Sequence, residues 1–307
     1  MTSIEAPFIQ ADPISVLKNI KRFRTKKMEE VIHVTGDIHY AVFAFPRNKT
    51  ILTIHDCVFL YYKKGMRKLI LLWFWLKLPV RHARYITTIS EASKRDILTY
   101  TGCDPKKVKV IPDPVDPAFI FSLKDFNQSK PVILHIGTGP NKNLERVIEA
   151  VRNIPCHLYI IGKLLPQQQN LLNANGVEFS NHFRLSKEEL IDAYRTCDMV
   201  VYMSTFEGFG LPIVEAQASG RPLITSNIAP MNEVAGKGAH LADPYSIQSI
   251  REGILKVILE PAYREQLTEE GLRNLLRFDP EKIAGEYYDL YQSVAHENQQ
   301  VIPAFQK

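Results

Sequence analysis

The sequence has few cysteines, and none of them has metal-binding spacing. Its 307 residues include Cys57, Cys103, Cys156 and Cys197, each more than forty residues from the next. Because no C-x-x-C pair is present, neither a zinc module nor a dithiol redox site is predicted. Unpaired thiols are typical of a reducing cytosol. We therefore expect a cytoplasmic protein without disulfide bonds.

Export signals and long apolar runs are also missing. The N-terminus, Met1 to Glu5, lacks the basic region and following apolar stretch of a secretory signal. The longest apolar run, Leu69 to Leu78, has about ten residues and includes Lys77, whereas a membrane span needs about 20. The sequence predicts no transmembrane segment.

The overall composition is that of an ordinary globular protein. With 45% hydrophobic and 23% charged residues, 15 glycines and 19 prolines, collagen-like, low-complexity and wholly disordered chains are excluded. The length predicts about two domains. Residues 1–130 hold 22 basic and 12 acidic residues (22 − 12 = +10), and residues 131–307 hold 16 and 21 (16 − 21 = −5). Two halves of opposite charge indicate domains that meet different partners.

Short β-branched runs alternate with segments of helical period, most clearly from Pro131 onward. The predicted strands cover residues 31–34, 50–54, 85–89, 108–111, 132–136, 157–161, 199–203 and 222–225. This alternation predicts α/β domains with parallel sheets covered by helices. The prolines of residues 112–117 interrupt both the strand and the helical period, so this segment is the expected edge of the first domain. The polar residues 124–130 are expected to be a linker. Parallel sheets bind ligands beyond the carboxyl ends of their strands, so we expect the function in those loops.

One such loop, Gly137 to Asn143, follows a predicted strand and opens a helix. Backbone N–H groups beside glycines and one lysine, Lys142, suit a phosphate or pyrophosphate. The loop does not fit G-x-x-x-x-G-K-[ST], which disfavours a P-loop nucleoside triphosphatase. A tight strand-to-helix turn with a solvated lysine is the alternative interpretation.

A second loop, Phe206 to Ala216, carries two glycines and two glutamates. The glycines Gly208 and Gly210 allow close approach of the backbone to a ligand. Glu207 is expected at the start of the loop and Glu215 in the first turn of the following helix. Carboxylates there can accept hydrogen bonds from sugar or ribose hydroxyls. Alternatively, each glutamate is only a helix-start charge that answers the helix dipole.

Taken together, the motifs resemble glycosyltransferase family 4, the retaining nucleotide-sugar enzymes of GT-B fold. Residues 207–215 match the family's E-x7-E motif, and residues 53–56 (T-I-H-D) match its T-x-H-D segment. Residues 89–97, residues 110–116 and the E-x-x-G of residues 233–236 followed by residues 242–244 match further segments in the same order. The resemblance implies two Rossmann-like domains whose parallel sheets face each other across a cleft.

The resemblance also implies a role for each matching residue. Glu215 would hydrogen-bond the ribose of the donor nucleotide, Glu207 would hold hydroxyls of the transferred sugar, and Lys142 would neutralise the diphosphate. His55 would lie near the transferred sugar, although a histidine that merely closes a strand is the alternative. We name His55, Glu207 and Lys142 as catalytic candidates. The donor-binding candidates are Gly137, Thr138, Asn141, Lys142, Gly208, Phe209, Gly210, Leu211 and Glu215.

Three departures from the family pattern are visible. Asn141 stands where the family often has an arginine, and Arg184 or Lys163 is a candidate replacement for that cation. Asp113-Pro114 replaces the usual Asn-Gly. Fewer residues than usual precede residue 31, so the first domain is expected to be abbreviated, with residues 7–27 forming a helix or an arm.

Residues 61–78 are first basic and then apolar and aromatic. As a helix this segment could lie on an anionic membrane surface, close to a lipid-linked acceptor. A core helix with a solvated basic end is the alternative interpretation. Nucleic acid is not expected as a partner, because the basic residues fit no recognised module.

We thus predict a retaining transferase that moves a hexose, mannose or similar, from a nucleotide diphosphate sugar to a glycan or lipid-linked acceptor. It would be cytoplasmic or peripheral on the inner membrane face and would need no cofactor or metal ion. The expected domains are an acceptor-side domain (1–123), a donor domain (124–280) and a C-terminal helix crossing back (281–307). The alternatives are a nucleotide-sugar epimerase or phosphorylase, or a non-catalytic donor-binding scaffold subunit.

Overall fold

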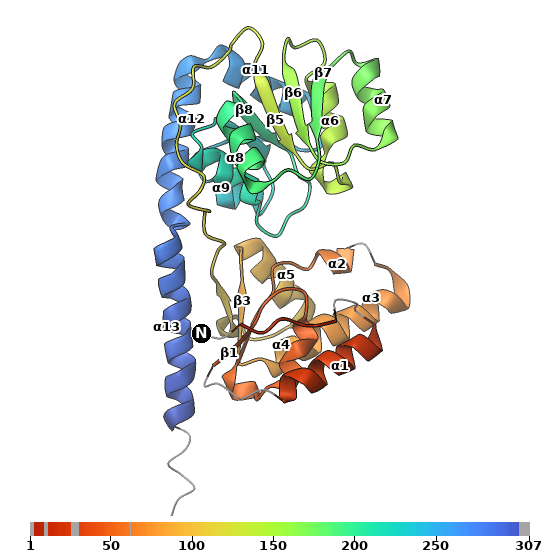
Figure 1. Ribbon diagram of the computed structural model, residues 1–307, viewed down its shortest axis with the longest axis vertical. Coiled ribbons are helices and arrows are strands. Elements are labelled where there is room, and N and C mark those ends of the chain that lie inside the picture. The colour runs from red at the N-terminus through yellow and green to blue at the C-terminus, as the bar shows by residue number, and fades with distance from the viewer. Residues whose placement is uncertain (1–2, 9–11, 26–30, 62, 301–307) are drawn as a thin grey trace, which may run out of the picture. The chain divides into compact units, whose positions relative to one another are not determined.

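The chain divides into two compact units, each built on its own parallel sheet (Figure 1). The computed structural model describes residues 3–8, 12–25, 31–61 and 63–300. Unit 1 comprises Met1–Pro112 and Ile283–Lys307, and unit 2 comprises Asp113–Lys282. The predicted α/β class with two parallel sheets is confirmed. The division falls after residue 112, at the start of the proline segment expected to be the edge of the first domain and before the expected domain limit at residue 123.

Unit 1 contains a four-stranded parallel sheet in the order β1-β2-β3-β4. The strands are β1 (Ile32–Val34), β2 (Thr50–Thr53), β3 (Tyr85–Thr88) and β4 (Val108–Val110). The connecting helices are α1 (Pro13–Arg24), η1 (His39–Ala44), η2 (Arg47–Lys49), α2 (Val58–Tyr61), α3 (Gly65–Leu71), η3 (Leu72–Lys77), α4 (Leu78–His82), α5 (Glu91–Thr101) and η4 (Pro105–Lys107). When each strand lies next to its predecessor, right-handed crossovers place their helices on one face. On this face Leu52 and Ile86 pack with Val80 of α4 and Ile97 of α5.

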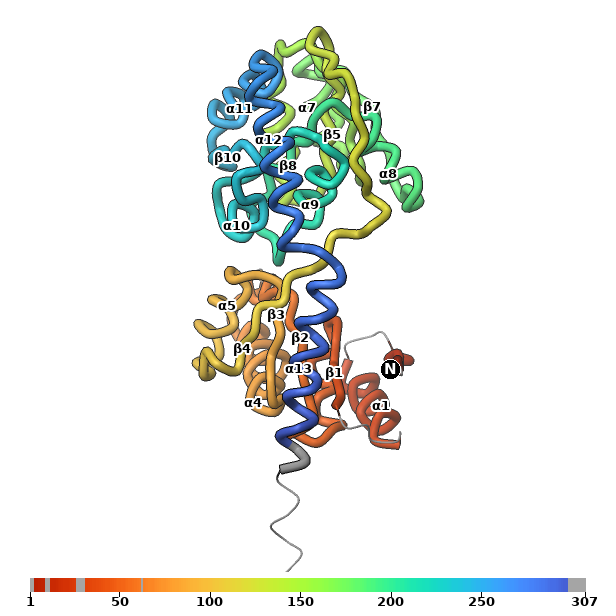
Figure 2. The backbone as a smooth tube through the Cα atoms, turned by 90° about the vertical axis from the view of Figure 1, so that its left-hand side faces the viewer, coloured from red at the N-terminus to blue at the C-terminus, as the bar shows by residue number. Residues whose placement is uncertain are grey.

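A helix from far along the chain packs against the opposite face of this sheet (Figure 2). The helix is α13 (Pro280–Gln300), and its residues from Ile283 onward belong to unit 1. Ile283, Leu290 and Val294 are buried against Ile51 of β2 and Ile111 after β4. The core of unit 1 therefore combines segments from both ends of the described chain.

Unit 2 contains a six-stranded parallel sheet in the order β10-β9-β8-β5-β6-β7. The strands are β5 (Val132–Ile136), β6 (His157–Ile161), β7 (Glu178–His182), β8 (Met199–Tyr202), β9 (Leu223–Ser226) and β10 (His240–Ala242). The helices are η5 (Pro140–Lys142), α6 (Leu144–Ala150), α7 (Pro166–Ala174), α8 (Lys187–Thr196), α9 (Leu211–Ala218), α10 (Met231–Ala235), α11 (Ile247–Leu259), α12 (Pro261–Asn274) and η6 (Leu275–Arg277). Numbered within the unit, this is the doubly wound order 3-2-1-4-5-6, whose direction of winding reverses between β5 and β8.

The polar segment that was expected to be a linker is instead anchored on unit 2. The buried carboxylate of Asp198 accepts hydrogen bonds from Lys124 Nζ at 2.5 Å, from Asn127 N at 3.0 Å and from Val132 N at 2.7 Å. Ser122 lies just before this segment, and its carbonyl accepts a hydrogen bond from the buried Arg221 at 2.5 Å. These bonds hold residues 122–132 on unit 2.

The basic N-terminal segment is partly described. It forms the helix α1, which begins at Pro13 behind the N-cap Asp12 and buries Asn19 and Phe23. Lys26 and Lys27 lie outside the described residues, as does Tyr62 of the basic and apolar run. Within the described helices, none combines the length and the apolar character that crossing a membrane requires. The four cysteines are all free thiols.

Candidate functional site

Two loops of unit 2 meet where the direction of winding reverses. The first follows β5 and the second follows β8, and these strands are neighbours in the sheet. Thr205 N donates to the carbonyl of Asn141 at 2.8 Å, and Asn141 Nδ2 donates to the carbonyl of Phe206 at 3.1 Å. The carboxyl-end crevice at such a point is where doubly wound sheets bind ligands. The structure thus brings the two predicted loops together.

Lys142 is positioned by the glycine that precedes it in the loop. Gly137 has a φ of +93°, and a Cβ atom there would lie 2.6 Å from Lys142 Cγ. The aliphatic part of Lys142 therefore runs across a position where only glycine fits. Its Nζ lies 2.5 Å from Glu207 Oε1 and 3.1 Å from the hydroxyl of Tyr202. One cation is thereby fixed between the two loops.

Glu207 receives a second hydrogen bond from the same loop. Asn141 Nδ2 lies 3.1 Å from Glu207 Oε1, the oxygen that also accepts from Lys142. The side chains of Lys142 and Glu207 are only 24% and 16% exposed, so their ion pair is partly shielded from water. Lys142 and Glu207, which are far apart in the sequence, thus form a polar centre that is already in place in the folded protein.

Thr138, also in the first loop, holds the shape of the loop through hydrogen bonds to neighbouring segments. The Thr138 hydroxyl donates to the carbonyl of Lys163 at 2.7 Å, and Gln168 Nε2 donates to the Thr138 carbonyl at 3.0 Å. Of the two cations considered as replacements for an arginine, Lys163 is therefore adjacent to this loop. Arg184 instead stacks on Phe183, with its guanidinium carbon 5.2 Å from the ring centre.

The glycines of the second loop allow a sharp entry into α9. Gly210 has a φ of +102°, and a Cβ atom there would come within 3.1 Å of Ile213 Cδ1. Phe209 is buried edge-on against Phe278, with ring centres 5.5 Å apart, so its backbone and not its ring is available to a ligand. Leu211 begins α9 and is 43% exposed.

Glu215 lies one residue further into its helix than the sequence predicted. It is the fifth residue of α9 and belongs to the second turn, because the helix begins at Leu211. Its Oε2 accepts a hydrogen bond from the hydroxyl of the buried Tyr194 at 2.6 Å. Burial raises the pKa of the Glu215 carboxyl, and the hydrogen bond from Tyr194 opposes this rise only in part. The second carboxylate oxygen can accept from a ligand.

We expect Glu215→Gln to stabilise the ligand-free protein near pH 7.5. Because the pKa of Glu215 is higher in the folded than in the unfolded chain, the folded state loses stability as the pH rises through that interval. The amide keeps an acceptor for Tyr194 without this penalty. The Tm should rise by roughly 2–4 °C, which corresponds to about 1 kcal/mol for a unit of this size. The increase should become small near pH 4, because this lies below the ordinary glutamate pKa of about 4.3 and the carboxyl is then mostly protonated in both states. Calorimetry at pH 7.5 and pH 4 measures the change in Tm. An equal increase at both pH values would contradict the raised pKa of Glu215 as its cause.

His55 is the one predicted site residue that lies in unit 1. It follows β2, and its backbone carbonyl accepts a hydrogen bond from the hydroxyl of Ser93 at 2.8 Å. The other predicted residues all lie in unit 2. His55 and the other predicted site residues therefore belong to different units.

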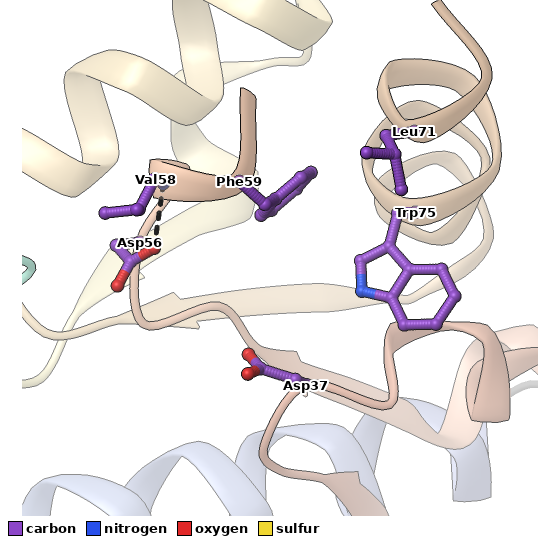
Figure 3. Close-up of a pocket in the computed structure, with 6 residues that line it drawn as sticks. All are labelled: Asp37, Asp56, Val58, Phe59, Leu71 and Trp75. Atoms are coloured by element: carbon purple, nitrogen blue, oxygen red, sulfur yellow. Dashed lines mark hydrogen bonds between the residues drawn. The ribbon is translucent and has the colours of Figure 1, made fainter. Parts of the chain in front are cut away.

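Unit 1 also contains a cavity that the sequence did not indicate, with a volume of about 460 Å³. It is lined by Asp37, Asp56, Val58, Phe59, Leu71 and Trp75. In Figure 3, Phe59 points toward the helix that carries Leu71 and Trp75, and the two aspartates lie on the loops that follow β1 and β2. Asp56 Oδ1 accepts a hydrogen bond from Val58 N at 2.8 Å. The sequence signal that could have predicted this cavity is the pair of aspartates, Asp37 and Asp56, that follow the neighbouring strands β1 and β2.

The described residues contain no cluster of three or more histidine, cysteine, aspartate or glutamate side chains suited to a metal ion. The positive charge at the loop contact in unit 2 comes from Lys142. The N-terminal end of α9 follows the second loop and adds partial positive charge from its backbone N–H groups. This arrangement can hold an anionic ligand with hydroxyl groups.

Comparison with known sequences places the chain in a family. Residues 118–273, just over half of the chain, match the family described as "Glycosyl transferases group 1", and residues 6–119 match "Glycosyltransferase Family 4". The chain belongs to the group 1 glycosyl transferases. The matched residues include both loops of unit 2, and the predicted resemblance is confirmed.

Curated relatives among the group 1 glycosyl transferases include several mannosyltransferases. The serotype-specific mannosyltransferase WbdA of Escherichia coli is 28% identical over 217 residues, covering 63% of this chain and 27% of WbdA. The MMP α-(1→4)-mannosyltransferase of Mycolicibacterium hassiacum is 26% identical, covering 72% and 57%. The O-antigen chain mannosyltransferase RfbU of Salmonella typhimurium is 29% identical, covering 69% and 61%. The chain thus spans less than two thirds of the length of these relatives.

Solved structures of the same fold include two with TM-scores of 0.76. One is sucrose-phosphate synthase from Thermosynechococcus elongatus, with 18% identity over 92% of this chain and 77% of that chain. The other is Anabaena Alr3699/HepE in complex with UDP and glucose, with 17% identity over 91% and 82%. These similarities establish the GT-B fold, which the sequence predicted.

Proposed function

We propose that this protein transfers a hexose, mannose or a similar sugar, from a nucleotide diphosphate sugar to a glycan or lipid-linked acceptor in polysaccharide biosynthesis. The family membership and the mannosyltransferases among its relatives support the reaction class. The observation that carries the proposal is the contact between Lys142 and Glu207 at the reversal point of the unit 2 sheet.

Lys142 would bind the diphosphate of the donor. Its ammonium group is fixed by Glu207 and Tyr202, so it needs little reorganisation when negative charge grows on the leaving phosphate. A preorganised cation of this kind lowers the barrier most where charge develops in the transition state. The backbone N–H groups of residues 208–211, at the start of α9, would supply further positive potential.

The carboxylates would position the two ends of the donor. Glu207 is beside Lys142 and would accept hydrogen bonds from hydroxyls of the transferred sugar. Glu215 is partly buried in the second turn of α9 and would accept a hydrogen bond from the ribose. Asn141 holds Glu207, while Gly137 and Thr138 shape the loop under Lys142.

We propose a retaining reaction that needs no metal ion. The bond from the anomeric carbon to the diphosphate breaks through an oxocarbenium-like transition state, and the leaving phosphate takes the proton of the attacking hydroxyl. Lys142 and the N–H groups of α9 would carry the charge role that a divalent cation has elsewhere.

The cavity of unit 1 would hold the acceptor sugar. Asp37 and Asp56 can accept hydrogen bonds from its hydroxyls, while Phe59 and Trp75 offer apolar faces. His55, one residue before Asp56, would lie near the transferred sugar as the family resemblance implies. The two carboxylates would favour a neutral sugar over an anionic one in this cavity.

A panel of nucleoside diphosphates and their sugars tests the donor assignment. A ligand at 100 times its Kd stabilises the folded state by about 2.7 kcal/mol, which a thermal shift detects. The best donor is then incubated with glycan and lipid-linked acceptors, with and without EDTA, and the anomeric configuration of the product is read by NMR. Retention and rates within about twofold with EDTA are expected. Donor binding without transfer to any acceptor would favour a scaffold subunit, and an inverted product would contradict retention.

A further inference from the structure

The helix formed by α3 and η3 exposes large apolar side chains along one side. Met66, Leu69, Ile70, Trp73 and Phe74 are 71%, 51%, 50%, 50% and 60% exposed. Their spacing of i, i+3, i+4, i+7 and i+8 places them on one helical face. We call these five residues the apolar stripe. Contiguous exposed apolar surface of this kind marks a site of interaction.

The other side of the same helix fixes its orientation. Leu76 is fully buried, and Leu72 and Trp75 pack against the core of unit 1. The ring of Trp75 lies edge-on to Tyr40, with ring centres 5.3 Å apart. Because this side is packed, the apolar stripe cannot turn inward without losing core contacts. The core interpretation of this segment therefore holds for the packed side, and the membrane interpretation concerns only the exposed side.

The charged residues of the chain segment that carries the apolar stripe are of one sign. No acidic residue occurs between Asp56 and Glu91, a span that contains seven lysines and arginines. Lys63, Lys64 and Arg67 are exposed beside the stripe. The ammonium of Lys77 lies 5.0 Å from the centre of the Trp73 ring. A basic flank with exposed aromatic side chains is the pattern of a helix that lies in a lipid headgroup region.

We propose that α3 and η3 dock unit 1 on a bilayer that contains anionic lipids. The apolar stripe would enter the headgroup region, and Lys63, Lys64 and Arg67 would contact lipid phosphates. A second copy of the chain is the less suitable occupant, because pairing two apolar stripes would bring their basic flanks together. Nucleic acid would satisfy the lysines but would leave the apolar stripe in water.

The docked helix also borders the acceptor cavity. Leu71 and Trp75, which line that cavity in Figure 3, come from the helix that carries the apolar stripe. One helix diameter is about 10–12 Å, so docking holds the cavity close to the lipid surface. This step rests on the proposed function and selects its substrate class: the acceptor is a sugar attached to a lipid.

The two tryptophans of the chain, Trp73 and Trp75, provide the test, because one is in the apolar stripe and the other is packed. In a Trp75→Phe background, Trp73 alone reports on its surroundings. We expect a blue shift of its emission with vesicles of phosphatidylcholine and 30% phosphatidylglycerol, and little shift with phosphatidylcholine alone. High salt should reverse the binding, because it screens the lysines.

Co-sedimentation of variants of the full chain with the same vesicles identifies the residues that contact the lipid. Trp73→Ser/Phe74→Ser and Lys63→Gln/Lys64→Gln should each weaken binding by about tenfold. The matched controls are Ile120→Ser/Leu123→Ser and Lys237→Gln/Lys282→Gln, which change exposed residues of unit 2. The control proteins should bind like the unchanged chain.

Each remaining outcome overturns a defined part of the proposal. Absence of binding to anionic vesicles, or equal binding by all variants, would overturn the docking. A change of oligomeric state in Trp73→Ser/Phe74→Ser without lipid binding by the parent would assign the apolar stripe to a second copy. If docking holds but the unchanged chain transfers sugar to a free glycan faster than to a lipid-linked acceptor, the acceptor class is wrong. Donor binding, measured by thermal shift, reports on the proposed function separately.

Discussion

Replacing Lys142 by methionine should lower the rate of sugar transfer at saturating donor by about 10²- to 10³-fold. That is the effect of removing one preorganised group that stabilises negative charge in a transition state. Methionine keeps most of the apolar stem that passes over Gly137, so the loop should retain its shape. Initial rates with the donor identified by the thermal-shift panel measure the loss. The rate at saturation matters more than KM, because the leaving-group charge grows after binding.

Lys130→Met is the matched control for Lys142→Met. Lys130 is also paired with a glutamate, Glu178, at 2.7 Å, but both side chains are about half exposed. Exposed pairs of this kind contribute about 0–1 kcal/mol. The control should transfer sugar at the unchanged rate. Equal rates for the two variants would show that Lys142 has no role in the reaction.

Glu215→Gln should weaken donor binding by about 10- to 100-fold. A hydrogen bond to a charged group contributes about 1.5–3 kcal/mol, and each 1.4 kcal/mol is a factor of ten in Kd. The amide has one acceptor atom where the carboxylate has two, and Tyr194 already donates to this side chain. Titration with the nucleoside diphosphate alone measures the change. We expect this protein to be more stable but weaker in binding, a combination that a merely structural role for Glu215 would not produce.

Glu178→Gln serves as the control for Glu215→Gln. It removes an exposed carboxylate of unit 2 that is paired with Lys130 and lies on the strand β7. Its nucleotide affinity should equal that of the unchanged protein. A normal affinity in Glu215→Gln as well would remove Glu215 from the donor site and leave only its effect on stability.

The sequence predicted those strands that are rich in β-branched and apolar residues. β5 and β8 are runs of β-branched and apolar residues between turn signals, and the structure places both in the centre of the unit 2 sheet. β7 was missed because Glu178 to His182 is a polar edge strand with partly exposed side chains. β10 was missed because His240 to Ala242 includes no β-branched residue, unlike the equally short β1 and β4. Neither strand has the apolar pattern that a single sequence reveals.

The sequence identified the residues of the candidate site, but it did not predict which of their side chains are in contact. The sequence singled out Lys142 and Glu207 in separate loops, and nothing in their spacing indicated that they form an ion pair. Their contact requires β5 and β8 to be neighbours, which depends on the strand order of the whole sheet. The partner of Glu215, Tyr194, comes from α8, and its hydroxyl carried no sequence signal. The depth of Glu215 in α9 was misjudged because the helix starts at Leu211, before the proline.

The discontinuity of unit 1 affects the order in which a nascent chain can fold. Ile51 and Ile111 leave the ribosome long before Ile283 and Leu290, the residues that cover them. Domains usually fold as units during synthesis, with the N-terminal one first. Here one face of the first sheet stays uncovered until unit 2 has been made in full. Unit 2 can therefore complete its fold first, and the earlier part of the chain must be kept from aggregating until α13 arrives.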